Sequence, residues 1–470
     1  MSICGGKFCP IRQTYYQITA KFANDFPPNL PTLVVISYNL AMNNGVKNTY
    51  KPRVTDKILG FKLRSSSAVV IEGAKWCGKT TSAKRAAKSV MNFGDDTGGT
   101  QNVRLATTAT KMVLDGDTPR LFDEWQEVPM LWDAIRYEVD RRNSVGQFIL
   151  TGSAVPIPKN GDTSYRFRHS GVGRYSFLRM RPMSLYESGE SNGKVSLGDL
   201  FAGKEIAATC DLKLDQVAFL ACRGGWPFAT MLEGDLALAQ ARNYYDVLVH
   251  SDISRVDDTV RNPQIVERIM RSYARNQGSQ TSVESMARDA NVDSSTAKSY
   301  LNALSNIFAV ESIKAWSPNL RSRTAIRSTD THYYVDPSIA ASSLKATPDG
   351  LIGDLNTFGF IFETLCIRDL RVYAYVNGGE VYHYRDKNDL ECDAVVTGND
   401  GKYGLIEIKL GQDDNTIGSA VISLNKLADK IDTTKMRAPT FKAVLTANGV
   451  AAYRRPEDGV YVVPIGCLKD

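Results

Sequence analysis

Long apolar runs are absent from this sequence. No stretch approaches the roughly 18–20 consecutive apolar residues that a membrane-spanning helix needs, and the N-terminus has no apolar core of a secretory signal peptide. The eight cysteines show no paired Cys-x-x-Cys spacing, which argues against a zinc site or a disulfide framework. We therefore expect a cytoplasmic protein with reduced thiols and no membrane partner.

A strong net charge is absent as well. The 57 lysines and arginines exceed the 51 aspartates and glutamates by only six, which permits nucleic-acid binding without indicating it. The chain has 470 residues, and 43% of them are hydrophobic. That composition is ordinary for a globular protein, and the length exceeds what one core supports. We expect two to four domains, whose functions only local motifs can identify.

A complete phosphate loop is present. Residues 73–80 read Gly-x-x-x-x-Gly-Lys-Thr between a β-branched run at 68–72 and a helix-favouring segment at 82–89, which is the strand, loop and helix context of this motif. Its lysine reaches β- and γ-phosphate oxygens and its threonine offers a hydroxyl to Mg²⁺. A chance glycine- and lysine-rich turn is the alternative. The residues predicted to bind ATP are Gly73, Ala74, Lys75, Trp76, Cys77, Gly78, Lys79, Thr80 and Thr81.

Adjacent acids follow the loop at Asp123 and Glu124, after an apolar step. A nucleotide hydrolase needs one carboxylate behind the metal and another that activates water, so we assign Asp123 to Mg²⁺ and Glu124 to the general base. The next apolar segment ends in Thr151 and Ser153, either of which could place a hydroxyl beside the γ-phosphate. Solvated surface acids and an ordinary exit from a strand are the alternatives.

A group of basic residues comes next: Arg166, Arg168, His169, Arg174, Arg179 and Arg181. A guanidinium presented across a subunit boundary can neutralise γ-phosphate charge in the transition state. We select Arg174 as the candidate arginine finger, which implies a homo-oligomer. A solvated or DNA-facing basic strip is the alternative.

Helical patterns dominate the middle of the chain and predict a helical lid over 191–278, interrupted by a turn at 223–227. Residues 283–290 and a second segment that begins after Asp293 then have helix-turn-helix spacing. Segments 308–316 and 332–335 supply wing strands, so we expect a winged-helix module over 279–335. Residues 294–296 and Lys298 could face DNA, although modules of this kind also serve as protein–protein spacers.

The C-terminal part contains a second candidate site. Glu363 lies on an amphipathic helical pattern, Asp393 on a strand, and Glu407 and Lys409 two residues apart on the next strand, hence on one face of it. Asp393 and Glu407 could share a second divalent metal, with Lys409 orienting water for phosphodiester attack and Glu363 completing the acidic cluster. A structural salt-bridge cluster is the alternative.

Together these motifs resemble a prokaryotic family of AAA-type ATP-binding proteins with a C-terminal restriction-endonuclease-like domain of unknown function. The resemblance covers about 50–470 and rests on residues 71–80, 121–125, 148–153, 173–174, 181–185, 224–227 and the Glu363, Asp393, Glu407 and Lys409 set. It implies a multidomain α/β protein with a P-loop core over 49–190, a helical lid over 191–278, a winged helix over 279–335 and a PD-(D/E)xK-like domain over 336–470.

Residues 1–48 fall outside the resemblance, and we expect an atypical N-terminal extension there. Because Met42 immediately precedes the matching region, the first 41 residues are either an appended segment or an over-called start.

We predict a Mg²⁺-dependent, oligomeric ATPase that acts with DNA and carries a candidate nuclease site. Two alternatives stay open: a nucleotide-dependent switch whose C-terminal domain docks a partner without cleavage, and a toxin-like or defence effector nuclease gated by ATP.

Overall fold

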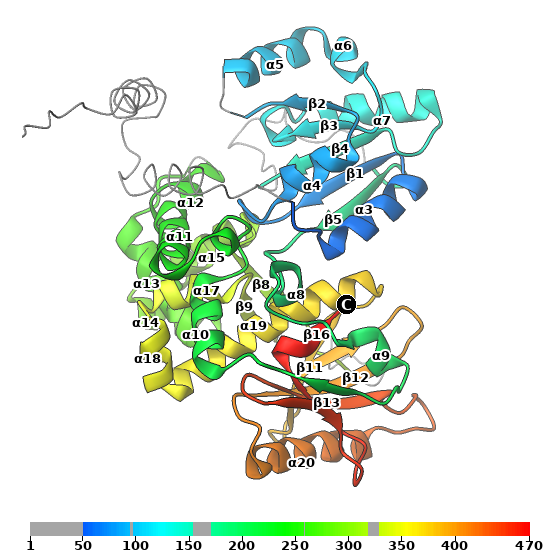
Figure 1. Ribbon diagram of the computed structural model, residues 1–470. Helices are drawn as coiled ribbons and strands as arrows, with labels where there is room; N and C mark the ends of the chain where they lie inside the picture. Colours follow the sequence, from blue (N-terminus) through cyan, green and yellow to red (C-terminus); the bar gives the residue numbers. More distant parts are fainter. Residues whose placement is uncertain (1–49, 95–96, 154–170, 258, 318–328) are drawn as a thin grey trace, which may run out of the picture. The chain divides into compact units, whose positions relative to one another are not determined.

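The computed structural model describes residues 50–94, 97–153, 171–257, 259–317 and 329–470 (Figure 1). The N-terminal extension expected at 1–48 lies outside these residues, as do Arg166, Arg168 and His169 of the basic group. The rest of the chain, residues 51–470, forms one compact unit.

A parallel sheet forms the core of the first region. Within the described residues its strand order is β2-β3-β4-β1-β5, and every pair in it is parallel. The sheet therefore brings the carboxyl ends of β1, β3 and β4 to one edge. Its strands are β1 (Ala68–Glu72), β2 (Ser89–Asn92), β3 (Arg120–Asp123), β4 (Phe148–Gly152) and β5 (Tyr175–Arg179).

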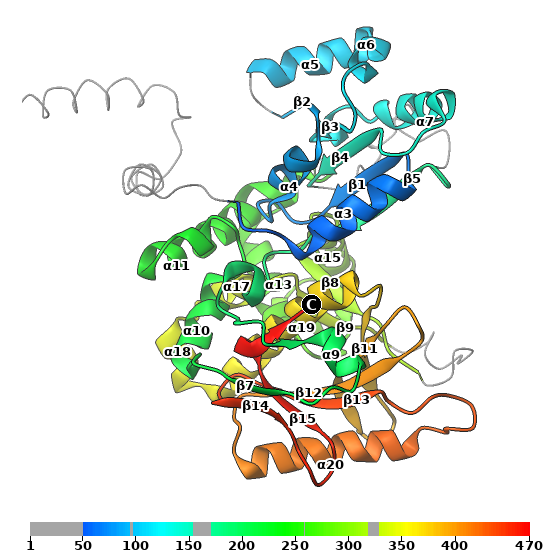
Figure 2. The same ribbon diagram turned by 45° about the vertical axis from the view of Figure 1, so that its right-hand side comes forward.

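Helices cover both faces of this sheet, which explains why β1 is apolar at successive positions. Val69 and Ile71 face the core that includes residues of α3 and α4, whereas Ala68 and Val70 face the core that includes residues of α5, α6 and α7. Figures 1 and 2 show α3 and α4 beside β1. The helices are α3 (Val54–Ser65), α4 (Lys79–Ala86), α5 (Thr97–Thr108), α6 (Thr110–Leu114) and α7 (Leu131–Arg142).

The middle of the chain is mainly helical, as its pattern predicted. Its helices are α10 (Leu214–Arg223), α11 (Gly234–Val247), the π-helical turn η4 (Leu248–Asp252), α12 (Ile253–Arg255) and α13 (Pro263–Arg275). Asn262 caps α13 through its side chain, and Pro263 occupies the first turn, where its missing N–H costs no helical hydrogen bond.

Two short helices and a hairpin follow at the expected positions. Helix α14 spans Val283–Ala290, and α15 spans Ser294–Asn306 with Asp293 as its N-cap. Strands β8 (Val310–Ile313) and β9 (Thr331–Tyr334) pair in antiparallel fashion. The side chains of Ser295 and Thr296 both donate to Asp293, so a carboxylate lies beside the residues expected to face DNA. Contact with DNA at this helix stays a prediction.

A second, mixed sheet holds the C-terminal candidate site. Among the described residues its strand order is β10-β11-β12-β13-β15-β14-β7. Helix α19 (Leu355–Val376) lies on one face and α20 (Asp414–Lys430) on the other (Figures 1 and 2). The strands are β7 (Ala207–Thr209), β10 (Val381–Arg385), β11 (Glu391–Thr397), β12 (Tyr403–Lys409), β13 (Phe441–Thr446), β14 (Ala451–Arg454) and β15 (Tyr461–Pro464).

Part of the segment assigned to the helical lid joins this C-terminal region. Strand β7 pairs with β14 of the second sheet, and β6 (Val195–Ser196) pairs with β16 (Leu468–Lys469). The expected boundary at residue 191 thus precedes two strands, β6 and β7, that pair with strands near the end of the chain. Short helices α8 (Leu185–Ser188), α9 (Leu197–Phe201), α17 (Pro337–Ser343) and α18 (Pro348–Gly353) complete the unit.

A buried ionic network connects α19 to two of the sequence motifs. Arg368 pairs with Asp336 at 3.0 Å and with Asp369 at 2.7 Å, and all three side chains are almost fully buried. The same carboxylates accept hydrogen bonds from the backbone N–H groups of Gly225 and Leu185. The Gly-Gly-Trp-Pro turn and the segment after Arg181 are therefore held by charges from helices far along the chain.

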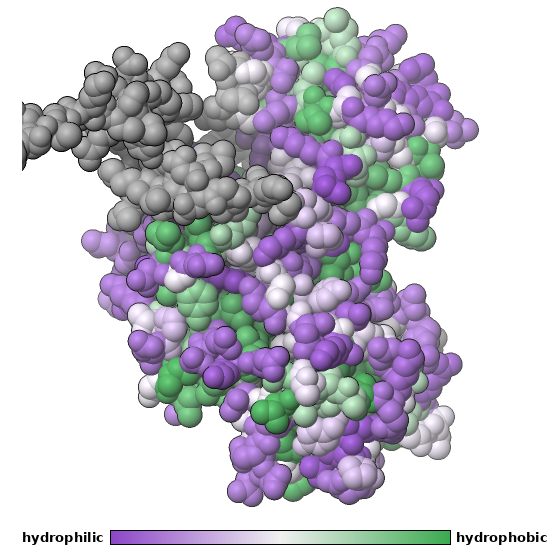
Figure 3. Space-filling model, viewed as in Figure 1, coloured by the Kyte–Doolittle hydropathy of each residue, from purple (hydrophilic) through white to green (hydrophobic). Residues whose placement is uncertain are grey.

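The surface shown in Figure 3 is largely hydrophilic, with hydrophobic residues in separate patches between the polar ones. None of the helices in the described part of the chain is long and apolar enough to cross a bilayer.

Candidate active site at the phosphate loop

The phosphate loop lies between β1 and α4, the context that its motif requires. Gly78 caps α4 with a left-handed φ of 103°. Gly73 has φ 155°, and a Cβ at this position would approach the carbonyl oxygen of Met180 to 2.0 Å. Gly78 is therefore favoured by its left-handed backbone conformation. Gly73 is required because a side chain there would collide with the backbone of Met180.

Lys79 is buried at the first position of α4 and points back into the loop. Its Nζ donates to the carbonyl oxygens of Gly73 and Ala74, at 2.8 Å each. The ammonium group of Lys79 is thus held by two neutral carbonyl acceptors. Phosphate oxygens are charged and accept stronger hydrogen bonds, so a bound phosphate would replace the carbonyls favourably.

Thr80 and Thr151 converge on one carboxylate oxygen. The hydroxyl of Thr80 donates to Oδ1 of Asp123 at 2.7 Å, and the hydroxyl of Thr151 donates to the same oxygen at 2.5 Å. Asp123 is buried at the end of β3, and Thr151 lies beside it in the register of β4. The structure therefore brings together a loop hydroxyl, a buried carboxylate and the candidate sensor.

Glu124 follows in a conformation that is uncommon for a non-glycine residue. Its φ is 56°, in the left-handed region, where strain is typical of functional positions. Its Oε2 accepts hydrogen bonds from Ser153 Oγ at 3.2 Å and from Gln126 Nε2 at 2.5 Å. Ser153 thus contacts the candidate base, and Gln126 is a partner that the sequence analysis did not select.

Arg53 is a second residue that the sequence analysis missed. Its Nη1 donates to the carbonyl oxygen of Cys77 in the loop and its Nη2 to that of Arg181, both at 2.7 Å. Its Nε pairs with the buried carboxylate of Glu187 at 3.0 Å. Local sequence offers no signal for this role, because the three partners lie 24, 128 and 134 residues away.

Three other loop positions differ in their surroundings. Lys75 forms an ion pair with Asp252 at 2.7 Å. Trp76 is 58% exposed and has a left-handed φ of 63°, and Thr81 is exposed as well. The loop therefore presents an aromatic ring to solvent next to its phosphate-binding backbone.

Arg174 lies at the opposite end of the sheet from the phosphate loop of its own chain. It precedes β5, whose first residue pairs with Ala68 at the start of β1. Its guanidinium pairs with Asp140 on α7 through contacts of 2.7 and 3.0 Å. This ion pair raises the pKa of Arg174 through a hydrogen bond to Asp140. A role in the same chain's site is not indicated, and the role across a subunit boundary stays a prediction.

The structure brings Asp393, Glu407 and Lys409 of the C-terminal cluster into contact. Lys409 Nζ lies 2.7 Å from Glu407 Oε2 and 3.6 Å from Asp393 Oδ2. Ser423 Oγ donates to Glu407 at 3.3 Å. Tyr333, from β9, donates to Oε1 of Glu363 at 2.5 Å. Ser423 and Tyr333 are partners that the sequence analysis did not select.

Burial and mutual repulsion perturb these carboxyls. Burial, with the charge of Asp393, raises the pKa of Glu363 to about 8. Burial and Asp393 also raise the pKa of Glu407 to about 7, against the opposing charge of Lys409. Although burial opposes it, the charges of Asp393 and Glu407 raise the pKa of Lys409. The single ammonium therefore offsets only part of the charge of the two carboxylates that it bridges.

Metal binding in this cluster stays a prediction. In the part of the chain that the structure describes, no three His, Cys, Asp or Glu side chains are placed to hold one metal ion together. The arrangement seen is the salt-bridge cluster, in which Lys409 supplies the positive charge.

Three family models match successive parts of the chain. Residues 65–189 match an AAA domain, residues 214–350 match a domain of unknown function (DUF8612), and residues 358–468 match another domain of unknown function (DUF4143). The first match confirms the prediction of an AAA-type P-loop core. The descriptions of the other two name no function, so the winged-helix and endonuclease-like parts of the resemblance stay predictions.

Two relatives and one solved structure are similar to this chain at low sequence identity. Uncharacterized proteins of Mycobacterium bovis and Mycobacterium tuberculosis are each 24% identical to this chain over 352 residues, which cover 74% of this chain and 71% of theirs. The structure of the Walker-type ATPase PABY2304 of Pyrococcus abyssi aligns with 63% of this chain and 97% of its own, with 13% identity and a TM-score of 0.37.

Proposed function

We propose that this protein binds and hydrolyses ATP at the phosphate loop with Mg²⁺ as cofactor. The observation that carries the proposal is the convergence of Thr80 and Thr151 on Asp123, directly beside Lys79 and Glu124 in the chain. A single loop motif can arise by chance, but these groups come from α4, β3 and β4 and meet at the carboxyl edge of a parallel sheet, where such folds bind ligands.

Mg²⁺ fits the donor set. The hydroxyl of Thr80 and the carboxylate of Asp123 are hard oxygen donors, already 2.7 Å apart, and Mg²⁺ prefers such donors together with phosphate oxygens. When bound, the ion neutralises phosphate charge that develops during hydrolysis.

The remaining roles belong to side chains of this protein. Lys79 would exchange its two carbonyl partners for phosphate oxygens and hold the β- and γ-phosphates in place. Glu124 would accept a proton from the attacking water while Ser153 and Gln126 hold its carboxylate in position. Thr151 would fix Asp123 through its hydrogen bond. The products are ADP and inorganic phosphate.

The deciding experiment separates binding from hydrolysis. Glu124→Gln keeps the size and hydrogen-bonding capacity of the side chain but removes its basicity, so this variant should bind ATP normally and fail to release phosphate. Glu127→Gln changes an exposed carboxylate three residues later and should turn over at the wild-type rate. Normal turnover by Glu124→Gln would overturn the assignment of the base, and absence of ATP binding by the wild type would overturn the proposal.

A second activity, metal-dependent cleavage of nucleic acid, is favoured by one observation. Asp393, Glu407 and Lys409 meet on β11 and β12, and Glu363 interacts electrostatically with Asp393 and Lys409. Carboxylates around a lysine suit phosphodiester hydrolysis once a cation joins them. DNA as the partner and a homo-oligomer as the active form belong to this proposal. The competing model is a nucleotide-dependent switch in which the cluster only docks a partner.

A further inference from the structure

A pocket of about 410 Å³ is lined by none of the loop residues 73–81 and by none of the C-terminal cluster residues. Its walls come from the end of β5, from α15 and β8, and from α19 and β10. A volume of this size falls in the range of small-molecule sites, roughly 300–1,000 Å³. The family matches assign no role to it, and the sequence analysis placed Arg179 and Arg181 only in a basic group, without their partners here.

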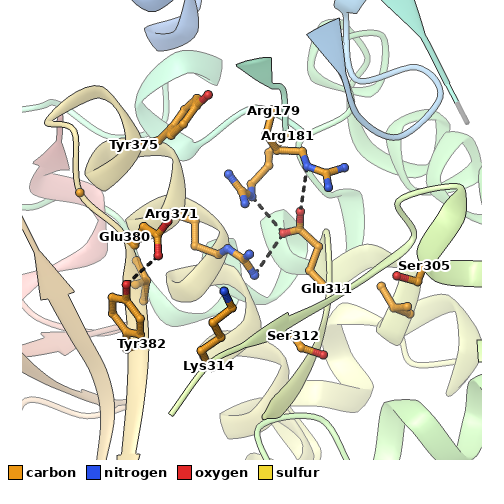
Figure 4. Close-up of a pocket in the computed structure, with 13 residues that line it drawn as sticks. Arg179, Arg181, Ser305, Glu311, Ser312, Lys314, Arg371, Tyr375, Glu380 and Tyr382 are labelled. Atoms are coloured by element: carbon orange, nitrogen blue, oxygen red, sulfur yellow. Dashed lines mark hydrogen bonds and ion pairs between the residues drawn. The ribbon is translucent and has the colours of Figure 1, made fainter. Parts of the chain in front are cut away.

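Positive charge predominates in this pocket. Arg179, Arg181, Lys314 and Arg371 line it together with two carboxylates, those of Glu311 and Glu380, and Glu72, beside Arg179 in the sheet, interacts with Arg179 electrostatically. Figure 4 shows the cationic side chains gathered around the carboxylate of Glu311, which lies 3.0 Å from Arg181, 3.2 Å from Arg371 and 3.8 Å from Arg179.

Glu311 does not neutralise the three arginines that surround it. Its side chain is 9% exposed. Burial opposes its ionisation, but the charges of Arg181, Arg371 and Arg179 outweigh burial and lower its pKa to about 2. One carboxylate therefore pairs with three guanidiniums and leaves them with a net positive charge, and Glu380 already accepts a hydrogen bond from Tyr382 at 2.7 Å.

One guanidinium nitrogen at this pocket has no hydrogen-bond partner in the part of the chain that the structure describes. Nη1 of Arg179 is buried and has no hydrogen-bond partner among the described residues, while its guanidinium lies over the ring of Phe308, 4.0 Å from the centroid. A buried charged donor without a partner is costly. No ion pair connects the exposed Lys314 to any described residue. An anion in the pocket would supply a partner for Lys314.

We propose that this pocket binds a phosphorylated small molecule of nucleotide size. Guanidiniums bind phosphate oxygens in bidentate geometry, and several of them match a diphosphate better than a monoanion. Tyr375 and Tyr382 line the pocket and offer aromatic surface for a base. A pocket of this volume suits a small ligand rather than an extended strand, so nucleic acid is the alternative that the experiment must separate.

The pocket is connected to the phosphate loop through one short segment. Arg179 and Arg181 direct their guanidiniums to Glu311, whereas the carbonyl oxygen of Arg181 accepts from Arg53, which also holds Cys77 in the loop. Met180, between them, contacts the loop through its carbonyl oxygen. A ligand that repositions Arg179 or Arg181 therefore acts on a segment that the ATP site shares.

The test uses the full chain with Lys79→Ala, which disables the phosphate loop so that binding elsewhere is measured alone. Isothermal titration with inorganic pyrophosphate, ADP and a ten-nucleotide single-stranded DNA distinguishes the ligand sources. Adding Lys314→Glu should weaken pyrophosphate and ADP binding about tenfold or more, because an attractive charge becomes repulsive. Adding Lys426→Glu, the same change at an exposed position of α20, should leave binding unchanged.

A second variant tests the sign of the effect. Glu311→Gln removes the internal carboxylate and should strengthen pyrophosphate binding, provided thermal unfolding shows that the variant is folded. Three results would overturn the proposal: no binding of pyrophosphate or ADP, equal binding in the Lys314→Glu and Lys426→Glu proteins, or binding of the oligonucleotide alone. Each is independent of whether the wild type hydrolyses ATP.

Discussion

The hydroxyl of Thr80 donates a 2.7 Å hydrogen bond to Asp123, although 43 residues separate the two in the chain. Thr80 is the second residue of α4 and Asp123 is the last residue of β3, so the contact exists only when the parallel sheet is formed. We expect Thr80→Val, which removes the hydroxyl at constant volume, to reduce ATP hydrolysis by roughly two orders of magnitude. Thr80→Ser should retain most of the activity. The check is the Mg²⁺ dependence of kcat, and equal loss in both variants would contradict a role for the hydroxyl.

Arg53 offers a prediction about stability. Its side chain is 3% exposed and its partner Glu187 is fully buried. Arg53→Ala removes the cation that pairs with that buried carboxylate and the two hydrogen bonds to the carbonyl oxygens of Cys77 and Arg181, so the free energy of unfolding should fall by about 3–5 kcal/mol. Urea unfolding measures this change, and Arg64→Ala, at an exposed position of α3, is the control. A loss as small as that of the control would show that the contacts to the loop and to Glu187 are dispensable.

Arg174 can be tested for action between subunits. Arg174→Ala should unfold almost like the wild type, because the ion pair with Asp140 lies at the surface. If the guanidinium acts on a neighbour's γ-phosphate, a mixture of Arg174→Ala and Glu124→Gln proteins should regain part of the ATPase activity that each lacks alone. Asp140→Ala, which releases the arginine, should keep activity. Failure of the mixture to complement would assign Arg174 a structural role.

Glu311 makes stability depend on acid pH. The neighbouring arginines outweigh burial and hold its folded-state pKa at about 2, below the usual 4.5, so the folded chain binds fewer protons than the unfolded one between these values. The stabilisation is complete above about pH 4.5 and is lost as the pH falls towards 2, by roughly 3 kcal/mol in full. Urea unfolding at pH 5 and pH 3 should show a smaller pH effect for Glu311→Gln than for the wild type. Glu205→Gln, which is exposed, should behave like the wild type.

Lys409 decides between cleavage and docking in the C-terminal region. Lys409→Ala removes the cation that bridges Asp393 and Glu407, so metal-dependent cleavage of DNA or RNA by the wild type should be lost in this variant. Lys402→Ala, at the turn before β12, should cleave normally. Single- and double-stranded substrates should be compared with and without ATP. If the wild type cleaves none of them, the non-cleaving switch becomes the better model.

The parts of the structure that the sequence predicted are those with local signals. The strand, loop and helix around Lys79 follow from hydrophobic pattern and glycine placement, and the helices at 283–290 and 294–306 follow from their caps and periodicity. Glu407 and Lys409 were grouped because alternation places residues two apart on one face of a strand, and Asp393 was added because it lies within an apolar strand just before them.

The parts that could not be predicted depend on long-range packing. Arg53, which precedes α3, contacts the loop and Glu187, both of which come from other parts of the chain. Strand β7 carries just three residues and joins an edge formed more than 240 residues later. The arginine cluster around Glu311 draws on three separate regions. No local pattern encodes which distant element supplies a partner.

Trp76 gives the protein an intrinsic optical probe. The other four tryptophans are at most 9% exposed, whereas Trp76 is 58% exposed within the loop that should surround the phosphates. Its emission is therefore the one most accessible to aqueous quenchers such as iodide. Nucleotide binding should alter that quenching without any label, and a Trp76→Phe protein would identify the part of the signal that comes from this ring.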